Sequence, residues 1–156
     1  MLRVTRLTDY ATVVLTVLAA EPERVLSAAE LAERAGLETP TVSKVLKPLA
    51  QAGLLEAFRG AHGGYRLSRP AGQISLISIV EAMEGPLAMT ECSLDDTSCG
   101  IASQCGARAN WRRINDIVAD ALRGVSLAQM LDAPSNPPSG PGPDASRRIP
   151  ARLANV

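Results

Sequence analysis

Aromatic residues make up only 3% of this 156-residue chain, and it has a single histidine. No apolar run approaches the roughly 18 residues that a membrane span needs. The apolar stretch of residues 11–20 follows Asp9, and no cleavage site of the secretory type ends it. These absences argue against a membrane protein and predict a cytoplasmic location. With 46% apolar and 21% charged residues, the chain has the composition of a globular protein.

The chain also lacks the residue groups on which catalysis depends. It has no paired nucleophile and base and no glycine-rich phosphate loop, so we expect no enzyme. Its net charge is zero, with nine Lys and Arg against seven Asp and Glu in residues 1–70, and four against eight in residues 71–132. This modest asymmetry does not by itself indicate a nucleic-acid partner, so the positions of the charges must decide.

Composition changes sharply at the end of the chain. Residues 133–156 hold six of the eleven prolines and two glycines. Such a segment cannot bury enough apolar surface to offset the entropy lost on ordering it. We therefore expect a disordered tail.

Apolar spacing and capping residues predict three helices in the first third of the chain. Residues 8–20 show one buried face. A second helix begins at Ser27, which opens a capping box, and stops at Gly36. Thr39 and Pro40 then form the start of a third helix. Two short helices joined by a tight turn are typical of a helix-turn-helix, although an ordinary helical hairpin fits the same residues.

A hairpin follows directly and favours the DNA-binding alternative. A proline at position 48 predicts a kink or break in the third helix before Gly53. Residues 54–58 and 65–68 are short extended runs separated by a loop with three glycines, which predicts a β-hairpin wing. Polar residues of the third helix and the wing are the candidate DNA contacts: Thr39, Thr41, Ser43, Lys44, Lys47, Arg59, His62 and Arg66.

Two further helices are predicted after the wing. Ser78 opens a second capping box, and the helix that it starts ends at Gly85. Residues 107–122 form a longer helix whose apolar stripe we expect to pack against a second copy of the chain, although it could also cap its own domain. The predicted organisation is a DNA-binding domain (1–85), a cysteine-bearing loop (86–106), a dimerisation helix with a short final helix (107–132) and the tail (133–156).

All three cysteines, Cys92, Cys99 and Cys105, lie within 14 residues. An odd number of cysteines in a cytosolic protein argues for metal or redox chemistry rather than a disulfide framework. Structural zinc sites usually have more closely spaced pairs and four ligands, whereas iron-sulfur clusters accept longer spacings. The spacing favours a cluster and leaves zinc and redox-active thiols as alternatives.

These features together resemble the IscR/NsrR-type iron-sulfur regulators, a bacterial family of dimeric winged-helix transcription regulators that sense iron-sulfur status, nitric oxide or iron. The resemblance covers residues 1–132. It depends on residues 7–11, the wing residues 59–67, the three-cysteine segment and residues 124–131. Three further segments are most similar to the branch that regulates the SUF iron-sulfur assembly operon: residues 39–46, 90–92 and 111–116.

The resemblance implies that the three cysteines ligate a 2Fe-2S or 4Fe-4S cluster. Some family members have a histidine as fourth ligand where this chain has Arg108, and a guanidinium has no free lone pair for iron. Others use an aspartate from the partner subunit's first helix, and Asp9 stands in that place. Glu91 is the second candidate, and an open or thiol-occupied site is the third. Asp9 is equally well explained as a charge favoured near a helix start.

The sequence thus predicts a mainly α fold with a winged helix-turn-helix, forming a homodimeric regulator of cluster-assembly genes that binds double-stranded operator DNA. Two alternatives remain open at this point. One is a nitric oxide or iron-responsive repressor of the same family. The other is a cluster-binding redox protein whose helix-turn-helix contacts proteins rather than DNA.

Overall fold

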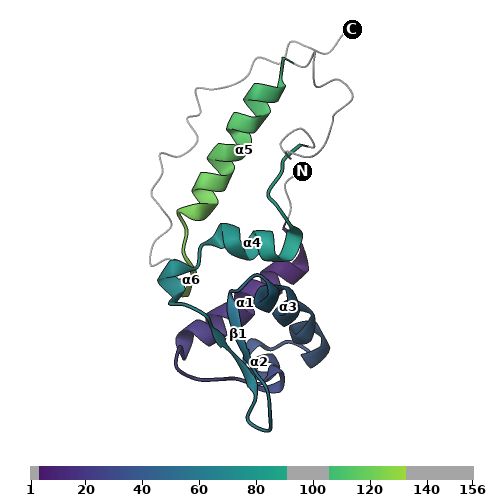
Figure 1. The fold of residues 1–156 in the computed structure, drawn as a ribbon, viewed down its shortest axis with the longest axis vertical. Coiled ribbons are helices and arrows are strands. Elements are labelled where there is room, and N and C mark those ends of the chain that lie inside the picture. The colour runs from purple at the N-terminus through teal and green to yellow at the C-terminus, as the bar shows by residue number, and fades with distance from the viewer. Residues whose placement is uncertain (1–3, 91–105, 133–156) are drawn as a thin grey trace, which may run out of the picture.

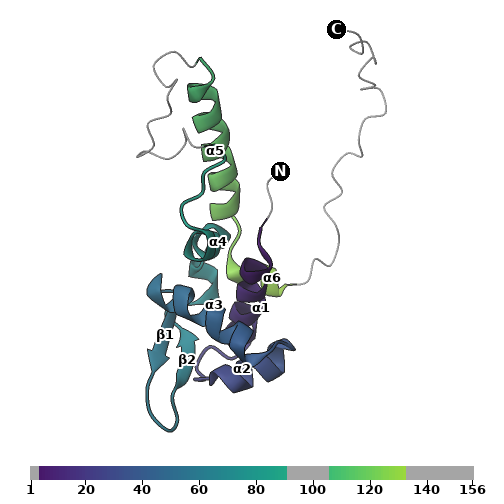
Figure 2. The same cartoon turned by 90° about the vertical axis from the view of Figure 1, so that its right-hand side faces the viewer.

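The computed structural model describes residues 4–90 and 106–132. Its elements, in chain order, are α1 (Arg6–Ala20), α2 (Ala28–Ala35), α3 (Thr39–Gln51), β1 (Leu55–Phe58), β2 (Gly64–Leu67), the 3-10 turn η1 (Ala71–Gln73), α4 (Leu76–Glu84), α5 (Arg108–Arg123) and α6 (Leu127–Leu131). Helices α1 to α4, α6 and the hairpin pack together, while α5 projects away from this body (Figures 1 and 2). The predicted mainly α fold with a two-stranded wing is confirmed.

Local hydrogen bonds set the ends of the first two helices. Thr5 caps α1, and its hydroxyl accepts a hydrogen bond from the Thr8 amide at 3.4 Å, so α1 starts two residues before the predicted position 8. Helix α2 has the predicted capping box between Ser27 and Glu30. It ends at Gly36, whose φ of 65° lies in the left-handed region that favours glycine.

Helix α3 corrects two predictions. Glu38 is the residue at its N-cap, its side chain makes no capping bond, and Thr39 is already helical. Pro48 does not break the helix, which continues to Gln51 with a bond from the Ala52 amide to the Pro48 carbonyl at 2.9 Å. Proline removes one helical hydrogen bond. Burial of Leu46 and Leu49 on either side of it keeps the last turn helical.

Helix α4 begins earlier than predicted. Its cap is Ser75, whose hydroxyl accepts from the Ser78 amide at 3.4 Å. The predicted cap, Ser78, is inside the first turn, and its hydroxyl donates to the Ser75 carbonyl at 2.7 Å. The predicted end is correct, because α4 stops at Glu84 and Gly85 follows with a φ of 88°.

The antiparallel wing is joined to the body by a third segment. Leu55 pairs with Leu67 and Phe58 with Gly64 at the two ends of the hairpin. Tyr65 then forms two backbone hydrogen bonds with Leu26, which precedes α2, at 2.8 and 3.0 Å. The wing is therefore connected on one side to the helix-turn-helix.

One apolar core lies between α1, α2, α3, α4 and the hairpin, and α6 contributes to it. Leu127 is fully buried, and its amide donates to the Ile74 carbonyl at 2.8 Å. The larger fully buried side chains of this core are Leu15, Leu18, Leu26, Leu31, Leu46, Leu49, Leu54, Ile74, Ile79 and Leu127. The short final helix thus packs against the first 85 residues.

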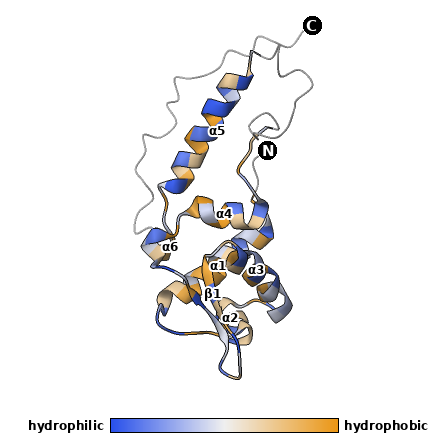
Figure 3. Cartoon of the chain, in the orientation of Figure 1, coloured by the Kyte–Doolittle hydropathy of each residue, from blue (hydrophilic) through white to orange (hydrophobic). Residues whose placement is uncertain are grey.

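Helix α5 is different because most of it lies outside this core. It contacts α4, and only Ala119 is buried. The ribbon of α5 alternates between hydrophilic and hydrophobic turns (Figure 3). The predicted stripe is divided between two directions: Val118 and Leu122 face a hollow beside α4, whereas Ile114 and Ile117 are exposed.

Candidate nucleic-acid interface and sensor segment

Helix α3 presents a polar outer face opposite its buried side. Val42, Val45, Leu46 and Leu49 anchor the inner side in the core. Thr39, Ser43 and Lys47 recur every four residues, so they lie on one exposed face with Lys44 beside them. The Ser43 hydroxyl donates to the Thr39 carbonyl at 3.0 Å, which leaves its oxygen able to accept. Thr41, also predicted as a DNA contact, is half-buried.

The loop of the wing carries two more of the predicted residues. Arg59 and His62 are exposed, and the loop between β1 and β2 extends beyond the body (Figure 1). Two glycines shape this loop. Gly60 has a φ of 112°, and a Cβ at Gly63 would lie 2.4 Å from the Phe58 carbonyl oxygen. Because β1 packs against α3, the wing and the outer face of α3 belong to neighbouring elements.

Arg66 lies on the wing but is already engaged. Its guanidinium donates to the Glu56 carboxylate at 2.8 Å, directly across the strand pair. It also lies over the Phe58 ring, with 5.2 Å between its carbon and the ring centroid. These contacts hold the Arg66 side chain against the hairpin.

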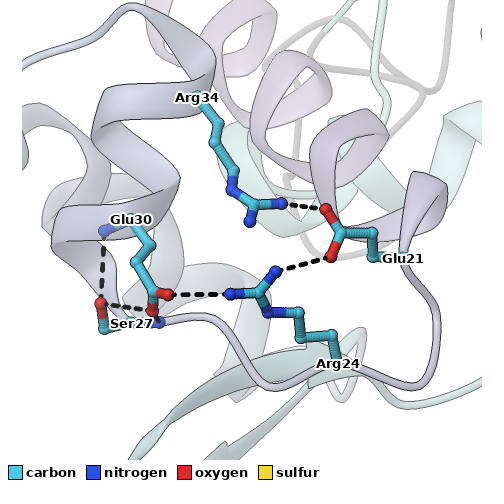
Figure 4. Close-up of polar contacts among 5 residues, drawn as sticks. All are labelled: Glu21, Arg24, Ser27, Glu30 and Arg34. Carbon is cyan, nitrogen blue, oxygen red and sulfur yellow. Dashed lines mark hydrogen bonds and ion pairs between the residues drawn. The ribbon is translucent and has the colours of Figure 1, made fainter.

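An ion-pair network joins α2 to the residues that follow α1 (Figure 4). The Glu21 carboxylate, just after α1, accepts from Arg34 of α2 and from Arg24 at 3.1 Å. Hydrogen bonds from Arg34 and Arg24 hold the pKa of Glu21 below its ordinary value. Arg24 also reaches Glu30 at 3.4 Å, whose pKa is lowered first by the Ser27 backbone amide. All four side chains are partly solvated, so these ion pairs contribute little to stability.

The proposed cluster ligands are only partly within the structure. Cys92, Cys99, Cys105 and Glu91 lie outside the described residues. Within residues 4–90 and 106–132, no group of three His, Cys, Asp or Glu side chains is arranged to hold a metal ion. Asp9 is exposed in the first turn of α1, and no other described residue bonds to its carboxylate.

Asp9 borders a hollow of about 1170 Å³ between the start of α1, α4, α5 and α6. Met89 and Trp111 line the same hollow, as does Glu84. Asp9 therefore lines the same hollow as Met89. Arg108 begins α5, and among the described atoms its buried Nε has no hydrogen-bond partner.

The sequence pattern does not predict the role of one residue, Glu84. Its Oε1 accepts hydrogen bonds from the Thr5 amide at 3.1 Å, the Thr5 hydroxyl at 2.6 Å and the Thr8 hydroxyl. Residues 85–90, here named the connector, begin at this contact. At their other end the Met89 amide donates to Asn115 Oδ1 on α5 at 3.1 Å. The Thr5 and Thr8 pair signals a helix cap, but nothing local points to Glu84.

A family model described as Rrf2, an iron-dependent transcriptional regulator, matches residues 4–133. The chain belongs to the Rrf2 family. Protein aau3 of Rhizobium meliloti is 34% identical over 133 residues, which cover 85% of this chain and 86% of that protein. Protein rrf2 of Nitratidesulfovibrio vulgaris is 31% identical over 114 residues, covering 67% and 76%.

Two solved structures place the fold in the same family. The structure of CymR, the global cysteine regulator of B. subtilis, has a TM-score of 0.65 at 29% identity and covers 84% of this chain and 97% of that one. IscR of T. potens has a TM-score of 0.60 at 28% identity, covering 83% and 86%. The predicted winged-helix regulator family is thus confirmed, and with it the prediction of a non-enzymatic protein. No helix in the described ranges is long and apolar enough to cross a bilayer.

Proposed function

We propose that this Rrf2-family chain is a homodimeric regulator that binds double-stranded operator DNA and senses iron-sulfur status through its cysteine segment. The observation that supports this most is the placement of that segment. Three cysteines lie within 14 residues, the first of them two residues after the connector. Glu84, just before the connector, bonds to Thr5 at the start of α1, and Met89 within the connector bonds to Asn115 of α5. The resemblance of residues 39–46 and 111–116 to the SUF branch favours cluster-assembly genes as the target.

DNA binding rests on the outer face of α3 and on the wing loop. Lys44 and Lys47 supply positive charge for phosphates, while Thr39 and Ser43 are exposed on the same helix for base edges or backbone. Arg59 and His62 extend the contact from the wing. Arg66 contributes differently, because its bonds to Glu56 and Phe58 stiffen the hairpin that carries the loop.

The donor set suits an iron-sulfur cluster. Thiolates are the usual ligands of cluster iron, and a bound cluster would supply a redox-active centre that oxidants or nitric oxide can dismantle. The three cysteines would provide the thiolates, and the exposed Asp9 carboxylate has no competing partner among the described residues. Carboxylate oxygen is a harder donor than sulfur, so Asp9 is the weakest of these four ligands.

The dimer is supported by α5. On α5, Ile117 is 58% exposed and Ile114 is 40% exposed, and both lie outside the hollow; Trp111, at the rim of the hollow, is 39% exposed. Apolar side chains exposed together on a projecting helix mark an interaction surface. A second copy of α5 would cover them and would bring two DNA-binding units into the two-half-site arrangement usual for such proteins.

The deciding experiment is anaerobic purification followed by an absorbance spectrum and by iron and sulfide analysis. We expect a brown protein that contains iron and acid-labile sulfide. Cys92→Ala, Cys99→Ala and Cys105→Ala should each abolish the colour without unfolding the chain. A colourless protein that holds stoichiometric zinc after attempted cluster reconstitution would refute the iron-sulfur assignment.

The likeness to CymR favours a second candidate, a regulator that answers a cysteine-related signal without a cluster. It predicts DNA binding that is unaffected by iron and sulfide. The same reconstitution separates the two functions when operator affinity is measured on both preparations. A chain that gains a cluster but shows no salt-dependent DNA affinity would instead be the redox interaction protein.

A further inference from the structure

Glu84 joins two parts of the chain that are far apart in sequence. It is the last residue of α4, and its contacts with Thr5 and Thr8 span 79 and 76 residues. One carboxylate oxygen accepts from an amide and two hydroxyls in the first turn of α1. The side chain of Thr8 is almost fully buried at 1% exposure. The start of α1 is thereby held to the end of α4.

Two physical effects strengthen this contact. A carboxylate near a helix N-terminus is favoured by the helix dipole, and a charged acceptor makes stronger hydrogen bonds than a neutral one. Hydrogen bonds from Thr5 and Thr8 accordingly hold the pKa of Glu84 below its ordinary value. Glu84 is therefore ionised and bonded near neutral pH.

The connector leads from Glu84 to residue 90, the last described residue before the cysteine segment. Gly85, with φ 88° and ψ −173°, turns the chain sharply after Glu84, and its amide donates to the Glu81 carbonyl at 3.0 Å. The remaining connector residues are mostly half-buried, and Met89 is bonded to Asn115. Cys92 follows Thr90 by two residues. The described part of the chain before the cysteines is therefore held at Glu84 and at Met89.

The start of α1 is in turn connected to the DNA-binding elements. Helix α1 contacts α2, α3, α4 and α6, and Ala11, Val14 and Leu15 pack in the same core as the inner side of α3. A shift of the first turn of α1 therefore changes the support of α3. Packed helices pass on such shifts because the interior is close-packed.

We propose that Glu84 is the positioning residue that couples the cysteine segment to the DNA-binding unit. With the carboxylate bonded to Thr5 and Thr8, the segment and α1 move together, and without these bonds the segment changes state with little effect on α3. A ligand shifts such an equilibrium only by its different affinity for the two arrangements. This inference rests on the proposed function.

The test compares full-length variants at two neighbouring acidic positions of α4. Glu84→Ala removes all three bonds, and Glu84→Gln keeps an acceptor oxygen in place. Glu81→Ala is the matched control, because Glu81 is exposed on the same helix and only its backbone carbonyl bonds to Gly85. Operator affinity is measured by fluorescence anisotropy for each chain, with and without a reconstituted cluster.

We expect wild type and Glu81→Ala to show the same ratio of operator affinity with the cluster to operator affinity without it. In Glu84→Ala the ratio should lie at least about fivefold closer to one than in wild type, while the cluster spectrum is unchanged. Glu84→Gln should restore most of the wild-type ratio. If the wild type responds to the cluster and Glu84→Ala shows an affinity ratio within about twofold of the wild-type ratio, the coupling alone is overturned. A wild type with no response overturns the proposed function and the coupling together.

A second measurement needs no cluster. In the cluster-free chain, hydrogen exchange of residues 4–12 should be about tenfold faster in Glu84→Ala than in wild type or Glu81→Ala. Thr8→Val keeps the shape of the side chain and removes only one of the three bonds to Glu84, together with the contact between the Thr5 and Thr8 hydroxyls. It should show a smaller change in the same direction, and it covers the case that Glu84→Ala does not fold. Unchanged exchange in both variants contradicts the role of Glu84.

Discussion

Gly64, the first residue of β2, has no room for a side chain. A Cβ placed there would lie 2.5 Å from the Leu26 carbonyl oxygen, 2.6 Å from its carbon and 2.9 Å from the Ser27 nitrogen. Backbone atoms cannot turn aside as the end of a flexible side chain would. Gly64→Ala must therefore push β2 away from the segment that precedes α2.

The cost of Gly64→Ala follows from what this displacement breaks. Tyr65 and Leu26 exchange two backbone hydrogen bonds at 2.8 and 3.0 Å, each worth about 1 kcal/mol net. Leu26 is fully buried, so separating the segments also loosens its packing. We expect a loss of about 2–3 kcal/mol in the free energy of unfolding. At roughly 4 °C per kcal/mol, Tm should fall by about 10 °C.

Thermal and urea unfolding followed by circular dichroism measure this effect. Gly72→Ala is the matched control, because a Cβ there meets nothing within 4 Å and its backbone is not in the left-handed region. The control should change stability by less than about 0.5 kcal/mol. If Gly64→Ala is as stable as Gly72→Ala, the close approach to Leu26 does not constrain the wing and the reasoning fails.

Four further outcomes are expected. Ile117→Asp should shift the mass in light scattering from dimer to monomer, whereas Ala109→Asp, at an exposed position of α5, should not. Lys44→Ala and Lys47→Ala should each lower DNA affinity and reduce the salt slope by about one unit, and an unchanged slope argues against phosphate contact. Asp9→Ala should leave a dimer with a more labile cluster. If the variant has the wild-type spectrum and cluster lifetime, Asp9 is only a charge near the helix start. The pKa of Glu30 is lowered from 4.5 by the capping box, so its contribution to stability is present above pH 4.5 and is lost as the pH falls through its folded pKa. Glu30→Gln should flatten that acid limb of the stability curve.

Local hydrogen bonds explain which helix ends were predictable. The capping box of Ser27 and Glu30 and the stops at Gly36 and Gly85 involve residues at most four apart, so the pattern alone identified them. The prediction of Ser78 as a cap is wrong, although Ser78 and Glu81 also match the local capping-box pattern. Ser75 caps the helix instead, and the carbonyl of the preceding residue, Ile74, accepts a hydrogen bond from the Leu127 amide of α6.

Packing also explains why helix α3 continues through Pro48. A proline inside a helix costs a hydrogen bond by itself, and the prediction of a break followed from that. The helix persists because Leu46 and Leu49 are buried in the core, a contribution visible only in three dimensions.

The sequence by itself determined the helix-turn-helix, the wing and the clustering of cysteines, because each is a pattern of nearby residues. It determined the candidate contacts Lys44 and Arg59 for the same reason. Only the tertiary structure decided that Arg66 is held by Glu56, that Gly64 must stay small beside Leu26, and that Glu84 binds the start of α1. These contacts join residues 10 to 79 positions apart, and their partners are set by how the helices and strands pack.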